Sequence, residues 1–254
     1  MVKQLQILNL IALLATVGIN YLSNTGIIND ETVGSVSADY RNLFTPAGYA
    51  FSIWGLIYTL LLGFAIYYGP FTKNTDLKEK TVLNIGWWFI VSCLANSMWI
   101  FTWLNGYLFL TIPVMIVLLI SLLKIILNNH EIIESRDLKT TLFLRLPFYI
   151  YSGWISVALI ADIATYLKKI EWDGFGISEM YWTLTMITIA TILHLYMIWQ
   201  RNMNAFAVVA VWALIAISVA NQNKNYIVYI AAIIAAVVVA LNIILRLFRK
   251  RAVF

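Results

Sequence analysis

Long stretches without charged side chains alternate along the chain with short charged segments. These charge-free stretches cover 4–29, 42–72, 81–123, 146–161, 180–200, 202–223 and 225–245. A helix needs about 20 mostly apolar residues to cross a bilayer. The third stretch is long enough for two helices divided by the turn dipeptide Asn105-Gly106, and the fourth continues past Asp162 to Leu167. The sequence therefore predicts an all-α polytopic membrane helix bundle with about eight transmembrane helices, at roughly 4–22, 46–69, 82–104, 107–127, 145–168, 180–200, 203–220 and 226–248.

The positive charges give this bundle an orientation. With the N-terminus inside, 13 of the 17 Lys and Arg residues, Arg136 among them, fall on the inner side, and only Arg41, Lys168, Lys169 and Lys224 fall outside. Lys and Arg collect in cytoplasmic loops. We therefore expect an integral protein of a bacterial inner (cytoplasmic) membrane with both termini in the cytoplasm.

Composition excludes several other classes of protein. Hydrophobic residues make up 62% of the chain, charged residues 11%, and there is one cysteine, whereas soluble domains are about 45–50% apolar. A soluble globule, a disordered tail and a disulfide scaffold are excluded. The net charge of +5 is explained by the Lys and Arg residues that collect on the cytoplasmic side of a membrane protein. Membrane lipids are therefore expected as partners and nucleic acid is not.

Three predicted helices each carry aromatic side chains at helical spacing together with polar groups. The candidate ligand-binding residues are Phe51, Trp54, Tyr58, Asn96, Trp99, Tyr151, Trp154 and Asp162. Most of them fall in the outer halves of their helices, beneath the connection 23–45, which is long enough to act as an external lid. If these faces meet, they line an aromatic cavity suited to a planar ligand. Helix packing and interfacial belts remain the alternatives, with Trp103, Trp172 and Trp182 in an outer belt and Trp199 in an inner one.

Asp162 is an ionisable residue within a span, and such residues tend to face a cavity or a partner. It could orient a ligand, carry a proton or be protonated and structural. Three functions follow: a receptor or carrier for a hydrophobic molecule, a proton-coupled transporter that uses Asp162, or a membrane enzyme. No metal ligands are predicted, because no His, Cys and acid residues lie at metal-ligand spacing. No catalytic residues are predicted either.

Three motifs resemble those of the tryptophan-rich sensory protein family (TspO/MBR, translocator protein-like). The run F-T-P-A-G-Y-A-F-S-I-W-G-L-I-Y at 44–58 is similar to its T-P-P signature, N-S-M-W at 96–99 to its third helix, and L-P-F-Y at 146–149 with Trp154 to its fifth. The resemblance implies a five-helix bundle, capped by the first loop, that binds porphyrins, sterols and aromatic ligands. No cofactor is implied as a requirement, and a bound tetrapyrrole or lipid is compatible with it.

The resemblance also implies a domain division. Residues 1–168 correspond to a TspO/MBR-like five-helix membrane domain with the lid loop 23–45, and 169–254 add three transmembrane helices and a basic cytoplasmic tail. Ala47 replaces the second proline of the family motif, and Asp162 lies near the place where the family offers an amide. An ionised Asp162 would repel porphyrin propionates. The ligand, and whether the protein forms a homodimer, stay open.

Overall fold

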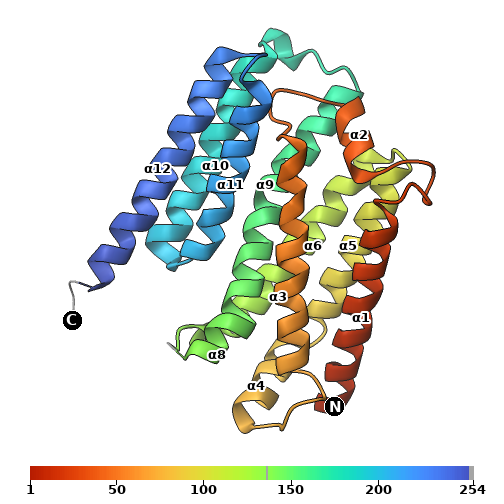
Figure 1. Cartoon of the computed structure of the whole chain (residues 1–254), viewed down its shortest axis with the longest axis vertical. Helices are drawn as coiled ribbons and strands as arrows, with labels where there is room; N and C mark the ends of the chain where they lie inside the picture. Colours follow the sequence, from red (N-terminus) through yellow and green to blue (C-terminus); the bar gives the residue numbers. More distant parts are fainter. Residues whose placement is uncertain (136, 252–254) are drawn as a thin grey trace. The chain divides into compact units, whose positions relative to one another are not determined.

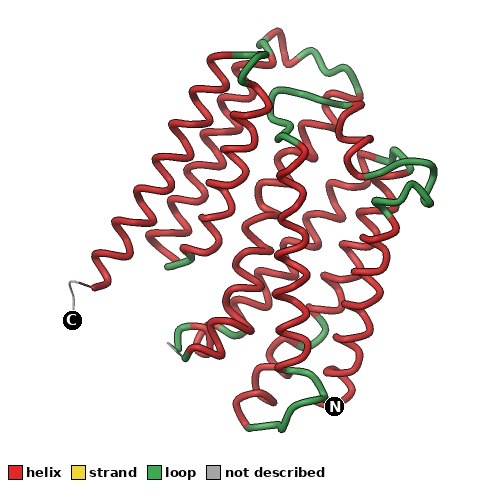
Figure 2. Tube along the Cα trace, in the orientation of Figure 1, coloured by secondary structure: helices red, strands yellow, loops and turns green. Residues whose placement is uncertain are grey.

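The structure is a computed structural model that describes residues 1–135 and 137–251, with the side chains of Lys250 and Arg251 left out. Helices and loops account for every described residue (Figures 1 and 2). The α-helices are α1 (Val2–Leu22), α2 (Val33–Asp39), α3 (Ile53–Tyr67), α4 (Asp76–Ile85), α5 (Trp88–Leu104), α6 (Leu108–Asn128), α7 (His130–Ile133), α8 (Leu138–Thr140), α9 (Leu146–Lys169), α10 (Glu179–Arg201), α11 (Asn204–Asn221) and α12 (Tyr226–Arg251). The predicted all-α fold is confirmed. Arg136, assigned above to the inner side, lies outside the described residues.

The spans agree in number with the sequence prediction. Seven helical segments are long and apolar enough to cross a membrane, and α4 with α5 forms an eighth span if the pair is counted together. The two helices meet at an angle of 47°, so the single helix predicted over 82–104 is wrong. Gly86 ends α4 with a φ of 53°, in the left-handed region where glycine meets no steric penalty. The chain then resumes at Trp88 in a new direction.

The chain folds into two compact units. The first contains Met1–Val36 and Ile53–Ser152, and the second contains Ser37–Ser52 and Gly153–Phe254. The break at 152 falls inside α9, whose first turns belong to the first unit. The domain division predicted at 168 stays a prediction.

The first unit packs α1 and α6 against α5, and α1 also contacts α3 and α4. The rings of Phe64, Phe89 and Phe148 interlock in its core, with centroids 5.1 to 6.0 Å apart. The predicted turn at Asn105-Gly106 joins α5 to α6, and Gly106 adopts a φ of 72°. These contacts fix the helices that carry the TspO/MBR-like motifs at 53–58 and 96–99.

The connection 128–144 is long and partly helical. It contains α7 and α8, followed by a wide π-helical turn at Thr141–Arg145. The carboxylate of Asp137 accepts a hydrogen bond from the backbone N–H of Thr140 at 2.9 Å and so caps α8. This backbone hydrogen bond lowers the pKa of Asp137, because it favours the ionised carboxylate.

The second unit is built on α10, α11 and α12, which lie side by side (Figure 1). Asn202, at the α10–α11 turn, adopts the left-handed conformation, and its side-chain oxygen accepts a hydrogen bond from Arg246 Nε at 3.0 Å. The ends of α10 and α12 therefore meet at one edge of the unit. The connection from α9 to α10 and the turn from α11 to α12 lie at the other edge.

Candidate functional site

Asn96 joins four helices of the first unit. Its Oδ1 accepts a hydrogen bond from Asn20 Nδ2 of α1 at 2.8 Å and a longer one from the Tyr58 hydroxyl of α3 at 3.4 Å. Its Nδ2 donates to the Tyr151 hydroxyl of α9 at 2.8 Å. Asn96 is 1% exposed. Because an unpaired amide in a membrane core is costly, these bonds fix the register of the four helices.

Aromatic rings surround this polar centre. Trp54 stacks on Tyr58 with centroids 5.5 Å apart and meets Tyr151 edge to face at 5.8 Å. Tyr58 and Tyr151 are buried, whereas Trp54 is half-buried. The two tyrosines thus combine ring packing with hydrogen bonds to Asn96, and Trp54, which is only half-buried, packs against both rings.

Trp99 supplies a hydrogen-bond donor on the same helix face. It follows Asn96 by one turn of α5, its side chain is 6% exposed, and its ring stacks on Trp103 at 5.2 Å. Its indole Nε1 has no hydrogen-bond partner among residues 1–135 and 137–251. Buried donors are normally paired. This N–H is therefore a buried hydrogen-bond donor for which the described residues provide no acceptor.

Trp103 is buried instead of facing lipid. It is 5% exposed, and its Nε1 donates to the backbone oxygen of Val33 at 3.2 Å. Its assignment to an outer interfacial belt is therefore wrong. Asn29 Nδ2 also donates to the backbone oxygen of Leu104, at 3.0 Å. The first part of the predicted lid loop is thereby fixed to the end of α5.

The other three predicted ligand residues lie in the second unit. The rings of Phe51 and Trp154 meet edge to face at 6.3 Å. Asp162 lies two turns further along α9 and is 1% exposed. The eight candidate residues thus form one group of five in the first unit and one group of three in the second.

Asn20 is a site residue that the sequence analysis missed. It follows Gln6, Asn9, Leu13 and Thr16 at alternating steps of three and four residues along α1, and Gln6, Asn9 and Thr16 are buried. Thr16 also crosses to α5, donating to the backbone oxygen of Cys93 at 3.1 Å. This polar stripe was visible in the sequence as a helical period, but it lacks the aromatic residues by which the other faces were chosen.

The segment 43–50, which carries the first motif, is bound to α11. Asn221 Nδ2 donates to the backbone oxygen of Leu43 at 2.8 Å, the Ala47 N–H donates to the backbone oxygen of Ala216 at 3.0 Å, and Tyr49 packs edge to face on Trp212 at 5.2 Å. One of the three helices that follow the predicted five-helix domain therefore holds part of the motif in place.

This attachment predicts slow proteolysis at the neighbouring Arg41, which is exposed. Asn221→Ala removes the hydrogen bond to Leu43, and cleavage after Arg41 by trypsin should become about fivefold faster, since one hydrogen bond of about 1 kcal/mol no longer opposes local opening. The matched control is Asn242→Ala, which removes the bond to Trp199 Nε1 at 2.9 Å on other helices. Equal cleavage rates in the two variants and the wild type would argue against the attachment.

The fold and the buried motif residues define an integral membrane helix bundle with several spans. Residues 6–245 match the TSPO-like protein family, so the chain belongs to that family. The match includes α10, α11 and most of α12, and the three additional helices are therefore part of the family pattern that this chain follows. No curated protein and no solved structure matches the chain.

Proposed function

We propose that this protein is a membrane receptor or carrier that binds a hydrophobic aromatic small molecule in its first unit. Trp54, Tyr58 and Tyr151 would stack with the molecule, and Asn96 and Trp99 would orient it. A tetrapyrrole such as a porphyrin is the leading ligand class, and sterols or other lipids are the next. The TSPO-like family membership and the aromatic group around Asn96 support this proposal.

The observation that carries the proposal is the buried indole N–H of Trp99. A donor inside the membrane loses its hydrogen bonds to water, and leaving it unpaired costs about 1–3 kcal/mol. A ligand carboxylate or carbonyl oxygen would recover that bond. The proposed ligand is therefore an aromatic molecule that also carries a hydrogen-bond acceptor, as porphyrins do through their propionates.

Phe51, Trp154 and Asp162 remain proposed ligand contacts in the second unit. Phe51 and Trp154 offer a second pair of rings. Asp162 would orient a polar group of a molecule bound within the second unit, and its carboxyl group favours a hydrogen-bond donor there over a carboxylate.

The proposed location is the bacterial inner membrane, with both termini in the cytoplasm. Within the second unit, Arg201, Arg246 and Arg249 lie at the edge where α10 and α12 end. The basic edge of a membrane protein faces the cytoplasm. The α9–α10 connection at the opposite edge would then face outward.

The proposal is tested by adding protoporphyrin to the full-length protein in detergent micelles and following tryptophan fluorescence. We expect saturable quenching, because a bound porphyrin would lie beside Trp54 and Trp99. The absorbance spectrum and mass of any molecule that co-purifies in mild detergent would then identify the natural ligand.

A further inference from the structure

A pocket lies entirely within the second unit, at the edge formed by the α9–α10 connection. Its volume is about 790 Å³, within the range of about 300–1,000 Å³ that is usual for small-molecule sites. The end of α9, the loop 170–178, the start of α10 and the segment 39–42 form its walls. None of the candidate ligand residues of the sequence analysis lines it.

The walls of this pocket carry an excess of negative charge. Asp39, Glu171, Asp173 and Glu179 contribute four carboxylates, and Lys168 and Lys169 contribute two ammonium groups. The formal charge of the lining is therefore −2, in a chain whose net charge is +5. This local inversion of charge favours a cation over an anion as the occupant.

Aromatic rings provide the second component of the pocket. Trp172 and Trp182 both line it, with ring centroids 5.1 Å apart at an angle of 52°. Tyr40 also lines the pocket, and the Lys169 ammonium lies 5.7 Å from its ring centre. The electron-rich faces of tryptophan attract organic cations and also pack against their apolar groups.

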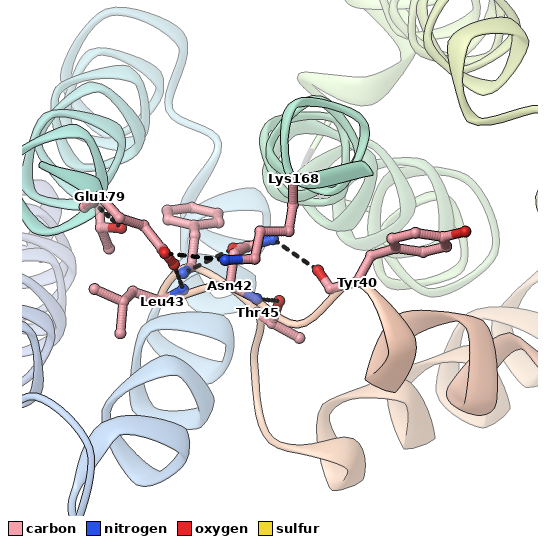
Figure 3. A network of polar contacts seen from close by, with 8 residues as sticks. Tyr40, Asn42, Leu43, Thr45, Lys168 and Glu179 are labelled. Carbon is pink, nitrogen blue, oxygen red and sulfur yellow. Dashed lines mark hydrogen bonds and ion pairs between the residues drawn. The ribbon is translucent and has the colours of Figure 1, made fainter. Parts of the chain in front are cut away.

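Hydrogen bonds hold these walls in place. The Glu179 carboxylate accepts from the Leu43 N–H at 2.7 Å and pairs with the Lys168 ammonium at 3.4 Å (Figure 3). Asn42 donates from its backbone N–H to Thr45 Oγ1 at 3.0 Å in the same network. Trp182 Nε1 donates to the Gly174 backbone oxygen at 2.9 Å. These bonds hold Trp182 and Glu179 in position, and a side chain that is already held loses little entropy when a ligand binds.

The loop 170–178, which carries Glu171, Trp172 and Asp173, has an unusual backbone conformation. Glu171, Gly174, Phe175 and Gly176 all adopt positive φ angles between 52° and 75°. The Asp173 carboxylate accepts a hydrogen bond from the Phe175 N–H at 3.0 Å and stabilises this conformation. Left-handed conformations at non-glycine residues carry a cost and occur often at functional sites.

From this combination we infer that the pocket is a second ligand site, which binds an amphipathic organic cation with aromatic or apolar groups. The cation stacks on Trp172 and Trp182, and the carboxylates of Asp39 and Glu171 balance its charge. This site goes beyond the proposed function, because it uses different residues and selects the opposite charge from that of a porphyrin.

The inference is tested with two probes of the same shape and opposite charge, tetraphenylphosphonium and tetraphenylborate. Equilibrium dialysis uses the full chain in detergent micelles, and the uptake of each probe by empty micelles is subtracted. We expect tetraphenylphosphonium to bind at one saturable site per chain and tetraphenylborate to show no saturable binding. Saturable binding of the borate with equal or higher affinity would overturn the inference.

Two variants test whether tetraphenylphosphonium binds in this pocket. Asp39→Asn combined with Glu171→Gln makes the lining formally neutral and should weaken tetraphenylphosphonium binding about tenfold, since each partly exposed charge contact contributes a factor of a few. Trp172→Leu should weaken it as well. The matched control is Glu131→Gln with Glu134→Gln, two exposed carboxylates near α7. Unchanged affinity in both pocket variants, or an equal loss in the control, would overturn the inference whatever the porphyrin titration shows.

Discussion

Gly153→Ala should destabilise the second unit by about 2–3 kcal/mol, the range of overpacking in a tightly packed core. A Cβ atom added at position 153 of α9 would lie 2.5 Å from the backbone oxygen of Phe206 and 3.1 Å from its Cα. Both atoms belong to the backbone of α11, so no side-chain rotation can relieve the contact. The two helices must move apart and lose packing. The free energy of unfolding in detergent micelles, measured with a chemical denaturant, checks this result.

Gly55→Ala is the matched control for this change. Gly55 also lies in a helix, α3, but apart from its chain neighbours and the adjacent backbone of that helix, a Cβ atom added there meets no atom of the described residues within 4 Å. Alanine is the better helix former by about 1 kcal/mol, so Gly55→Ala should leave stability unchanged or raise it. If Gly153→Ala were as stable as Gly55→Ala, the close approach of α9 and α11 would be wrong.

Asn96→Leu should destabilise the first unit by about 2 kcal/mol, because the buried Tyr58 and Tyr151 and the half-buried Asn20 lose a hydrogen bond at once. The side chains of Asn20, Tyr58 and Tyr151 all bond to Asn96, which is 1% exposed. Leucine nearly fills the space but offers neither a donor nor an acceptor. The same denaturant experiment measures this loss.

The control for Asn96→Leu is Asn223→Leu, in the exposed turn between α11 and α12. This substitution also replaces an amide by leucine and should change stability by less than about 0.5 kcal/mol, as surface substitutions usually do. A loss in Asn96→Leu no larger than that of Asn223→Leu would contradict the assignment of Asn96 as the polar centre of the four helices.

Much of the fold could be predicted from the pattern of charges. A bilayer requires long apolar helices, so the intervals between charged residues marked the spans within a few residues, for example 180–200 for α10 and 203–220 for α11. The break between α4 and α5 was not predicted, because Gly86 lies within a stretch that is uncharged throughout and many membrane helices tolerate glycine.

The sequence predicts only those parts of the candidate site that depend on the spacing of residues within one helix. The helical spacing of Tyr58, Asn96 and Tyr151 placed each of them on the correct face, and the structure joins them by hydrogen bonds. The contribution of Asn20 and the binding of segment 43–50 by α11 depend on which helices are neighbours. The helical period of one segment does not show which helices are its neighbours, because packing between segments that are distant in the sequence decides this.

The pocket of the second unit was hidden for a similar reason. Trp172 and Trp182 both lie near the ends of spans, where tryptophan is common, so the sequence predicts that they belong to an interfacial belt. They line a pocket because the positive φ angles of the loop 170–178 turn the chain back between α9 and α10. The sequence offered one usable signal, Asp173-Gly174-Phe175-Gly176, a dense group of turn-forming residues.

The proposed ligand site is tested most directly by titrating protoporphyrin into the wild type, Trp99→Phe and Trp87→Phe. Both variants lose one indole from the same part of the chain, but Trp99 Nε1 is buried, whereas Trp87 is 63% exposed. We expect saturable quenching in the wild type and in Trp87→Phe, with affinity about fivefold lower in Trp99→Phe, the effect of losing a hydrogen bond of about 1 kcal/mol. Quenching that does not saturate, or identical affinities in all three proteins, would contradict a ligand site at Trp99.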